Sequence, residues 1–430
     1  MFVKMFTNCF MLEGITKRLL FLFSLLSIFK FSLIGEEHWA NWMGPHYNGS
    51  LLGQELKLPP QGKEYVVEWE ASVGEGWASP VMDKSSVYLH HRVGKDEIIQ
   101  CLELKTGRER WQYSYPSGYR DDFGMANGPR STPSLSDDLI VTHGPQGLVH
   151  AIRLTDGTLL WRRDLKKDFS SPKGFFGRCS SPLMIDDRVI FDVGGPQTGL
   201  VALSLITGRT EWTTKPYGND YASPVPFFSK TGKQCLAFMR EGFLAVSISS
   251  GRESFFAPFR SPINASVNAS TPLVIGNLVF LSSCYEVGAG LWEYQEEEGS
   301  GELFKNVWQK KEILDCHYST PVSHAGNLFG FHGRQERGAV LRSVRLRDGR
   351  LNWEKKSLGS GNLIRVKNNI CTLTEQGELI VFSAESEKFS PLLRQQILGT
   401  GVRSHFALSN GFLIARDQRR LVCLNLNLFE

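Results

Sequence analysis

A short tripeptide repeat is the feature that most constrains how this chain can fold. Two small residues followed by a proline recur at 42 to 53 residue intervals, as Ala78-Ser79-Pro80, Ser131-Thr132-Pro133, Ser180-Ser181-Pro182, Ala222-Ser223-Pro224, Ser270-Thr271-Pro272 and Ser319-Thr320-Pro321. A glycine four residues before an aromatic keeps a similar period, as Gly107/Trp111, Gly157/Trp161, Gly208/Trp212, Gly251/Phe255 and Gly349/Trp353. Because two independent marks share one period, we infer one repeated unit rather than several unrelated domains.

Each unit is predicted to contain four strands. In the clearest copy, residues 189–191 and 200–203 are apolar runs, Thr207-Gly208 supplies a turn, and residues 210–212 form a strand that ends on tryptophan. Glycine in the turn tolerates the positive φ of a tight hairpin. Four strands in such a unit are typical of a β-propeller blade, whose single sheet buries both faces only when neighbouring blades stack on it. The aromatic of each outer strand is then expected to fill the space between blades.

Counting the units predicts eight blades over residues 65–430, with seven as the alternative count. The seventh unit lacks both marks but keeps apolar runs at 370–373 and 379–382. The eighth offers three strands, around 406–408, 412–414 and 421–424, and its missing outer strand is expected at 65–69, ending in Trp69. We therefore predict an all-β fold, an eight-bladed β-propeller of four-stranded antiparallel blades. Pairing of the N-terminal strand with the C-terminal blade would close the ring and remove open sheet edges.

Residues 1–35 are predicted to be a signal peptide or an N-terminal anchor. Lys17-Arg18 precedes eleven uncharged residues, 19–29, which are followed by Lys30 and a second apolar stretch. Eleven residues cross only about half of a bilayer core as a helix, whereas extension to Ile34 would allow an uncleaved anchor. A cleaved signal is preferred, so the membrane is expected as a partner only through an uncleaved segment. Residues 36–64 are expected to be a lead-in segment to the propeller.

Charge and cysteine content exclude several classes of function. The formal net charge is +4, but the first 35 residues hold four basic residues and one acidic residue, so the remainder carries a single positive charge. A nearly neutral body lacks the basic surface that nucleic-acid binding requires. The eight cysteines form no C-x-x-C pair, vicinal pair or zinc-like cluster. Cys101, Cys371 and Cys423 lie in alternating apolar runs and are predicted to be core residues.

Bulky polar residues that differ from unit to unit are the better candidates for a binding site, because blade packing accounts for the repeated marks. The three positions before each small-small-proline mark are expected to enter the innermost strand near one mouth of the central channel. Together with nearby loop positions, they give the predicted ligand-binding set: Trp77, Asn127, Arg130, Arg178, Tyr221, Asn268, His317, Tyr318, Arg334 and Glu336. Arginine clamps carboxylate or phosphate and aromatic faces stack on sugars or peptide side chains, so this set suits a polar or anionic ligand. Alternatively, the arginines and the histidine bond to strand-end carbonyls and fill the channel.

Three other stretches depart from the blade pattern and are predicted to be loops, namely residues 121–124, 174–177 and 333–336. Asp-Phe-Gly at 122–124 is a chance match to a kinase motif, because the accompanying phosphate and catalytic loops are missing. Asp121 and Asp122 could serve one site only if a turn brought both carboxylates to the same side. Arg334 and Glu336 either pair with each other or belong to the channel mouth. No nucleophile elbow, zinc-protease pair or phosphate loop occurs in the sequence, so neither catalytic residues nor metal ligands are predicted.

The repeat resembles a known family. The pattern Leu-Val-Ala-Leu-x-x-x-Thr-Gly-x-x-x-Trp, at residues 200–212, resembles the pyrroloquinoline-quinone-like propeller repeat of quinoprotein alcohol dehydrogenases and outer-membrane assembly lipoproteins. The opening Trp39-Ala40-Asn41-Trp42-Met43-Gly44-Pro45 looks most like exported bacterial members related to the assembly lipoproteins. The resemblance implies export to the periplasm or cell envelope of a bacterium, and it bears more strongly on fold than on activity.

Two functions are compatible with this resemblance. The first is a non-catalytic binding module of the envelope, whose partners are envelope proteins or a polar or anionic small ligand, although the chain lacks the lipid-bearing cysteine of the assembly lipoproteins. The alternative is a channel-mouth enzyme, either a quinone-dependent dehydrogenase or a carbohydrate-active protein. In the dehydrogenases, the quinone is held by calcium, a stacked tryptophan and a disulfide between adjacent cysteines. This sequence has no adjacent cysteines, so we expect no cofactor, with the quinone and calcium kept as the alternative.

Overall fold

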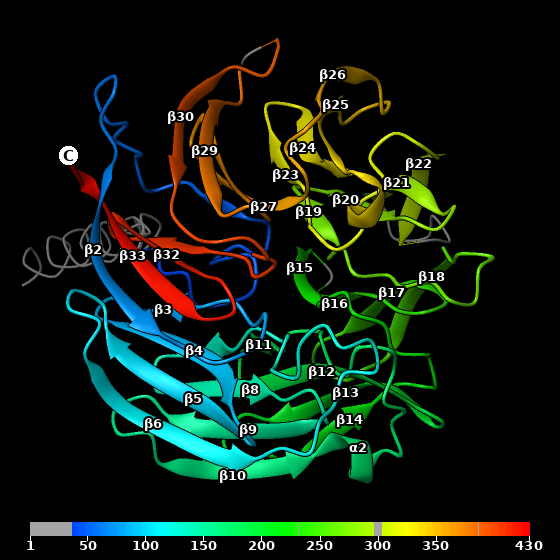
Figure 1. Ribbon diagram of the computed structural model, residues 1–430. Coiled ribbons are helices and arrows are strands. Elements are labelled where there is room, and N and C mark those ends of the chain that lie inside the picture. Colours follow the sequence, from blue (N-terminus) through cyan, green and yellow to red (C-terminus); the bar gives the residue numbers. More distant parts are fainter. Residues whose placement is uncertain (1–36, 231, 296–302, 386) are drawn as a thin grey trace, which may run out of the picture. The chain divides into compact units, whose positions relative to one another are not determined.

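Eight small antiparallel sheets follow one another along the chain in the computed structural model, which describes residues 37–430 except 231, 296–302 and 386. The predicted signal or anchor, residues 1–35, lies outside the described residues. The sheets are arranged as blades around a common centre (Figure 1). The all-β, eight-bladed propeller predicted from the repeat is therefore the observed fold.

In blades one to six, the strands run from the innermost to the outermost in chain order. The first three blades are β3 (Val81–Met82), β4 (Ser86–Val93), β5 (Asp96–Glu103) and β6 (Glu109–Pro116); β7 (Ser134–Leu135), β8 (Leu139–His143), β9 (Leu148–Arg153) and β10 (Leu159–Asp164); and β11 (Leu183–Ile185), β12 (Arg188–Gly195), β13 (Thr198–Ser204) and β14 (Thr210–Thr213). The next three are β15 (Val225–Ser229), β16 (Gly232–Phe238), β17 (Gly242–Ser247) and β18 (Glu253–Pro258); β19 (Leu273–Ile275), β20 (Leu278–Ser283), β21 (Gly288–Tyr294) and β22 (Phe304–Lys310); and β23 (Val322–His324), β24 (Asn327–His332), β25 (Val340–Arg345) and β26 (Leu351–Lys355).

The last two blades depart from this scheme. Blade seven consists of β27 (Gly361–Val366), β28 (Asn369–Thr374), β29 (Glu378–Ser383) and β30 (Pro391–Gln396), and a short strand of the lead-in segment, β1 (Ser50–Leu51), adds in parallel to β27. Blade eight consists of β31 (Ala407–Ser409), β32 (Phe412–Arg416), β33 (Arg420–Phe429) and β2 (Tyr65–Ser72). Strand β2 pairs antiparallel with β33, with Trp69 opposite Cys423. The outermost strand of the last blade therefore comes from the N-terminal side of the described chain.

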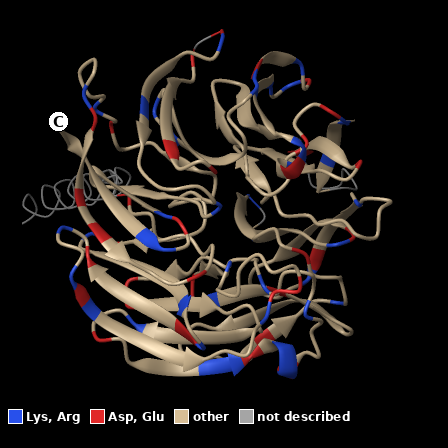
Figure 2. Ribbon diagram, in the orientation of Figure 1, with Lys and Arg blue, Asp and Glu red and all other residues tan. Residues whose placement is uncertain are grey.

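Helix is almost absent from the described residues. One turn of helix, α2 (Leu165–Asp168), follows β10, and a 3-10 turn, η1 (Gln335–Arg337), lies between β24 and β25. No helix in the described part of the chain has the length and apolar character needed to cross a membrane. Acidic and basic residues are interspersed over the blades (Figure 2).

The core is divided among the blade interfaces. Each of six apolar clusters joins two consecutive blades, from the first and second to the sixth and seventh, and a larger seventh cluster joins blades seven, eight and one. Middle strands such as β8 and β12 are consequently buried on both faces, while outer strands such as β10 alternate in exposure. Cys101, Cys371 and Cys423 are buried in the core, as predicted, and have free thiols.

The glycine–aromatic marks form the contact between outer strands. The ring of Trp161, for example, lies so close to Gly208 of the next blade that a Cβ there would be 2.7 Å from it, and its indole N–H donates to the Leu205 carbonyl at 2.8 Å. The same indole bond joins Trp69 to Leu104, Trp111 to Leu154, Trp212 to Ile248 and Trp308 to Leu346. Glycine is required because it permits both this close approach and a φ near +70°.

The small-small-proline marks form a second ring of contacts at the inner edge. The middle residue of each mark donates its backbone N–H to the side-chain hydroxyl of the middle residue in the next mark, from Ser79 to Thr132 at 3.1 Å and from Thr132 to Ser181 at 2.9 Å. The series continues to Ser223, Thr271 and Thr320. We call these five hydrogen bonds the hydroxyl belt. They explain why a small hydroxyl residue recurs at this position, since each buried N–H needs an acceptor.

Candidate functional site

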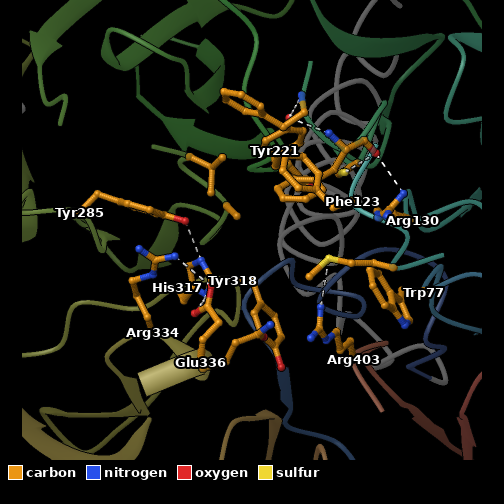
Figure 3. Close-up of a pocket in the computed structure, with 18 of the residues that line it drawn as sticks. Trp77, Phe123, Arg130, Tyr221, Tyr285, His317, Tyr318, Arg334, Glu336 and Arg403 are labelled. Atoms are coloured by element: carbon orange, nitrogen blue, oxygen red, sulfur yellow. Dashed lines mark hydrogen bonds and ion pairs between the residues drawn. The ribbon is translucent and has the colours of Figure 1, made fainter. Parts of the chain in front are cut away.

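A cavity of about 450 Å³ lies at the centre of the ring. Its wall includes residues that immediately precede or belong to the small-small-proline marks of blades one to six, which places it at one mouth of the central channel. Of the predicted set, it brings together Trp77, Arg130, Tyr221, His317, Tyr318, Arg334 and Glu336 (Figure 3). The residues before the marks lie in the segments leading into the innermost strands, not in those strands as expected, because each strand begins after the proline.

The charged groups of this mouth cavity are already paired. Arg130 lies 3.0 Å from the Asp121 carboxylate, and Arg334 lies 2.9 Å from Glu336. Arg403 lies 3.5 Å from Glu375, whose carboxylate also accepts a hydrogen bond from Tyr318 at 3.0 Å. Each arginine thus has a carboxylate partner, so this cavity does not have the excess positive charge that the predicted arginines suggest.

Stacked rings and guanidinium groups form one side of the cavity. The guanidinium carbons of Arg130 and Arg403 lie 4.9 and 4.7 Å from the centre of the Trp77 ring. The indole nitrogen of Trp77 and the Nε of Arg130 are buried without a hydrogen-bond partner in the described structure. A polar ligand atom could satisfy these donors, since buried N–H groups rarely remain unpaired.

On the opposite side, His317 and Tyr285 form a second polar cluster with the Arg334–Glu336 pair (Figure 3). The His317 Nε2 is 2.9 Å from the Tyr285 hydroxyl, and the Arg334 guanidinium lies 4.7 Å from the centre of the Tyr285 ring. Burial lowers the pKa of His317 from 6.5 to about 4, against the opposing effect of Glu336, so the imidazole is neutral at neutral pH.

Two loops give the cavity an apolar lip. The loop after β6 carries Phe123 and Met125, which are 57% and 43% exposed, and the loop before β11 carries Phe175 and Phe176, of which Phe175 is 43% exposed. The rings of Phe123 and Phe176 are 5.1 Å apart. Arg403 Nη1 donates to the Met125 sulfur at 3.8 Å. This hydrogen bond links the apolar lip to the segment that precedes the eighth blade. Exposed apolar side chains gathered at one opening are typical of an interaction site.

All three predicted loops contribute residues to this cavity. The carboxylates of Asp121 and Asp122 differ in burial and in their partners. Asp121 is buried against Arg130, whereas the Asp122 carboxylate is 61% exposed and pairs with Lys173, so the two do not form one acid–base pair. Arg334 and Glu336 both pair with each other and line the cavity, which combines the two alternatives expected for them.

Three residues of the predicted set do not line the mouth cavity. Asn127 receives a hydrogen bond from Arg92 on its backbone carbonyl, and its backbone N–H donates to Glu75. Asn268 donates from its side chain to the Met239 carbonyl at 3.0 Å, as expected for a residue that satisfies strand-end backbone groups. Arg178 also bonds to backbone carbonyls and lines a separate cavity.

Sequence reasoning missed Trp42, Tyr285 and Arg403, which come from the lead-in segment, the β20–β21 turn and the segment before β31. A signal existed for Trp42, since it belongs to the aromatic motif at residues 39–45. Tyr285 and Arg403 lie outside the repeated marks, and only the closed ring brings them to the same opening.

The side chains of the cavity wall can be compared with what nucleophilic catalysis and a quinone cofactor each require. Burial raises the pKa of the Cys179 thiol to about 12, opposite to the shift that activates a cysteine nucleophile. Within the described residues, no group of three or more His, Cys, Asp or Glu is placed to hold a metal ion. A calcium-held quinone requires several hard oxygen ligands, but Asp121, Glu336 and Glu375 are each engaged by an arginine. The residues present therefore do not fit that cofactor.

Comparison with known proteins agrees with the propeller fold. A family model described as outer membrane protein assembly factor BamB matches residues 62–254. The structure of BamB from Moraxella catarrhalis is similar with a TM-score of 0.62 and 14% identity, over 84% of this chain and 97% of that one. Residues 62–254 therefore resemble the pyrroloquinoline-quinone-like β-propeller family, and the described chain shares the propeller fold.

Other solved propellers are equally similar in fold. The quinohemoprotein alcohol dehydrogenase from Comamonas testosteroni aligns with a TM-score of 0.63 and 11% identity, over 91% of this chain and 80% of that one. A computationally designed protein, Ika8, aligns with a TM-score of 0.55 and 12% identity, over 84% of this chain and all of that one. Among curated proteins, no sequence match is found. At these identities, the structural likeness extends to the propeller fold and not to a particular activity.

Proposed function

We propose that this protein is an exported, non-catalytic β-propeller that acts as a protein- or ligand-binding module of the bacterial cell envelope. The observation that carries the proposal is the mouth cavity, where exposed aromatic side chains surround an opening whose arginines are already paired. Such a wall favours an apolar or aromatic group with a few polar atoms, such as a side chain of an extended protein segment or a small aromatic ligand.

The protonation states of the wall support a binding role over a catalytic one. A general acid or base works best with a pKa near the operating pH, and an attacking cysteine needs a lowered pKa. At the mouth, burial lowers the pKa of His317 to about 4 and raises that of Cys179 to about 12. Both shifts move these groups away from neutral pH.

The envelope location rests on two lines of support. Residues 1–35 have the pattern of an export signal, and the matched family model and one similar structure are named as an outer-membrane assembly factor. We propose envelope proteins as partners on this basis, with a small aromatic molecule that carries a few polar atoms as the other kind of ligand. We propose no cofactor, because the carboxylates at the mouth do not fit calcium and a quinone.

Binding of an aromatic probe tests the mouth cavity. The full-length protein is titrated with anilinonaphthalene sulfonate, which combines aromatic rings with one anionic group, and the dye fluorescence is followed. Saturable binding is expected, and Trp77→Ala or Phe175→Ala should each weaken it about threefold to tenfold, the worth of one aromatic contact. The control is Phe228→Ala, since Phe228 is 66% exposed on β15 and lies outside the cavity wall.

Equal binding by the parent, the two cavity variants and the control would contradict a site at the mouth. A parallel incubation with pyrroloquinoline quinone and Ca²⁺ tests the enzyme alternative. Stoichiometric uptake of the quinone with a rise in Tm would overturn the non-catalytic assignment, whereas an unchanged Tm and absorbance are expected.

A further inference from the structure

A second cavity, of about 230 Å³, lies between the first three blades and is distinct from the mouth cavity. Three segments form it: the loop after β6, the β8–β9 turn with α2, and the loop before β11. Its longer polar side chains are Arg120, Gln146, Lys166, Lys173 and Arg178. We call it the side cavity. It accounts for Arg178, which the sequence singles out and the mouth cavity does not use.

The charge of the side cavity differs from that of the mouth. Four of its lining residues are basic and none is acidic. Neither Arg120 nor Lys166 forms an ion pair with a carboxylate in the part of the chain that is described, and α2 appears as a basic segment in Figure 2. Lys173 lies 2.6 Å from Asp122, whose carboxylate is 61% exposed and is not part of the cavity wall. The wall therefore has more positive than negative charge.

Arg178 places a buried positive charge in this wall. The residue is 4% exposed, and its guanidinium donates to the Val193 carbonyl at 3.2 Å and to the Ser171 hydroxyl and the Pro172 carbonyl. All three acceptors are neutral oxygens. The buried carboxyl of Asp192 also acts on Arg178, but burial raises the pKa of Asp192 well above its usual value, which weakens its negative charge. A buried cation is costly unless a full counter-charge accompanies it.

We propose that the side cavity binds inorganic phosphate or the phosphate group of a small phosphate monoester. A phosphate carries up to two negative charges and several acceptor oxygens near neutral pH, so donors from different segments can contact it at once. The volume admits a phosphate with a small organic group attached. This site is independent of the proposed function of the mouth, where each arginine already has a carboxylate partner.

Titration calorimetry of the full-length protein with inorganic phosphate and with glycerol phosphate tests the proposal, at constant ionic strength and with acetate as the comparison anion. Saturable binding of both phosphates, with a rise in Tm that acetate does not give, is expected. Arg120→Glu combined with Lys166→Glu should weaken phosphate binding at least about tenfold, because each lost contact is charge-assisted. Both side chains are exposed, so the variant is expected to fold.

The control is Lys167→Glu, which makes the same kind of charge reversal as Lys166→Glu at an exposed position of the same helix that does not line the cavity. Phosphate affinity equal in the double variant and in the Lys167→Glu control would overturn the proposal. So would a Tm response that phosphate and acetate share, or binding to phosphatidylglycerol vesicles without binding of the soluble phosphates.

Discussion

The inner edge of the propeller and the loops beside it lie only a few residues apart in the chain. The residues of the inner edge recur from blade to blade, whereas those of the loops do not. At the inner edge, the hydroxyl belt repeats one contact from blade to blade, with Thr132 bonded to both Ser79 and Ser181. In the loops, Phe123 and Phe175 lie outside the repeated marks and line the mouth cavity. The difference indicates that the repeated residues hold the blades together, so the residues beside them are free to determine binding.

Replacing one aromatic residue from each region should give the largest difference between them. Trp212→Ala removes a buried ring that packs on Gly251 and donates to the Ile248 carbonyl, so the free energy of unfolding should fall by about 3–5 kcal/mol. Phe123→Ala removes a ring that is 57% exposed and should change stability by no more than about 0.5 kcal/mol. Urea denaturation measures both. Equal losses would mean that the loops are as much a part of the framework as the blade contacts.

The second prediction concerns a histidine that is buried inside a blade, His143. Burial, with a smaller effect of Arg178, lowers the pKa of His143 from 6.5 to about 3, and neither ring nitrogen has a hydrogen-bond partner in the described structure. The unfolded chain binds a proton at this position below about pH 6.5, but the folded chain does so only near pH 3. Stability from a neutral His143 is therefore present above pH 6.5 and is lost as the pH falls through this range.

Between pH 6.5 and 5, His143→Phe should recover up to about 2 kcal/mol of the acid-induced loss. Thermal unfolding at a series of pH values tests this expectation. The comparison variant is Val141→Ala, which changes the same strand without removing a titratable group; it should leave the pH dependence of the Tm unchanged. A His143→Phe protein with the parental pH dependence would show that this buried imidazole does not contribute.

A third prediction concerns the hydroxyl belt. Thr132→Val keeps the shape of the side chain but removes the acceptor of the buried Ser79 N–H, which should cost about 1–3 kcal/mol. Thr132→Ser keeps the hydroxyl and should cost clearly less. Denaturant titrations of the two variants distinguish hydrogen bonding from packing. If serine and valine are equally destabilising, the belt residue is selected for its size.

The fold was predictable because its determinants are local and repeated. The contact between Trp161 and Gly208 depends on two residues that belong to a mark found in five of the units. The mouth cavity was predictable in part, since its position follows from the segments before the marks. Tyr285 and Arg403 could not be found in this way, because they meet the other wall residues only across the closed ring.

The predicted roles of Arg178 and Asn268 show a second limit. Both residues occupy the expected segments, but strand ends leave backbone carbonyls that need donors, and their side chains supply them. A sequence can indicate that a polar residue lies near the channel. It does not indicate which of several nearby hydrogen-bond acceptors the side chain will contact. Arg178 also lines the side cavity.

The seam between β2 and β33 constrains the order of events during biosynthesis. The partner strand of residues 65–72 spans residues 420–429, and seven complete blades lie between the two in the chain. During translation, β2 therefore stays without its partner until the seven intervening blades have been made. A chain interrupted before residue 420 would keep an unpaired strand edge on β2.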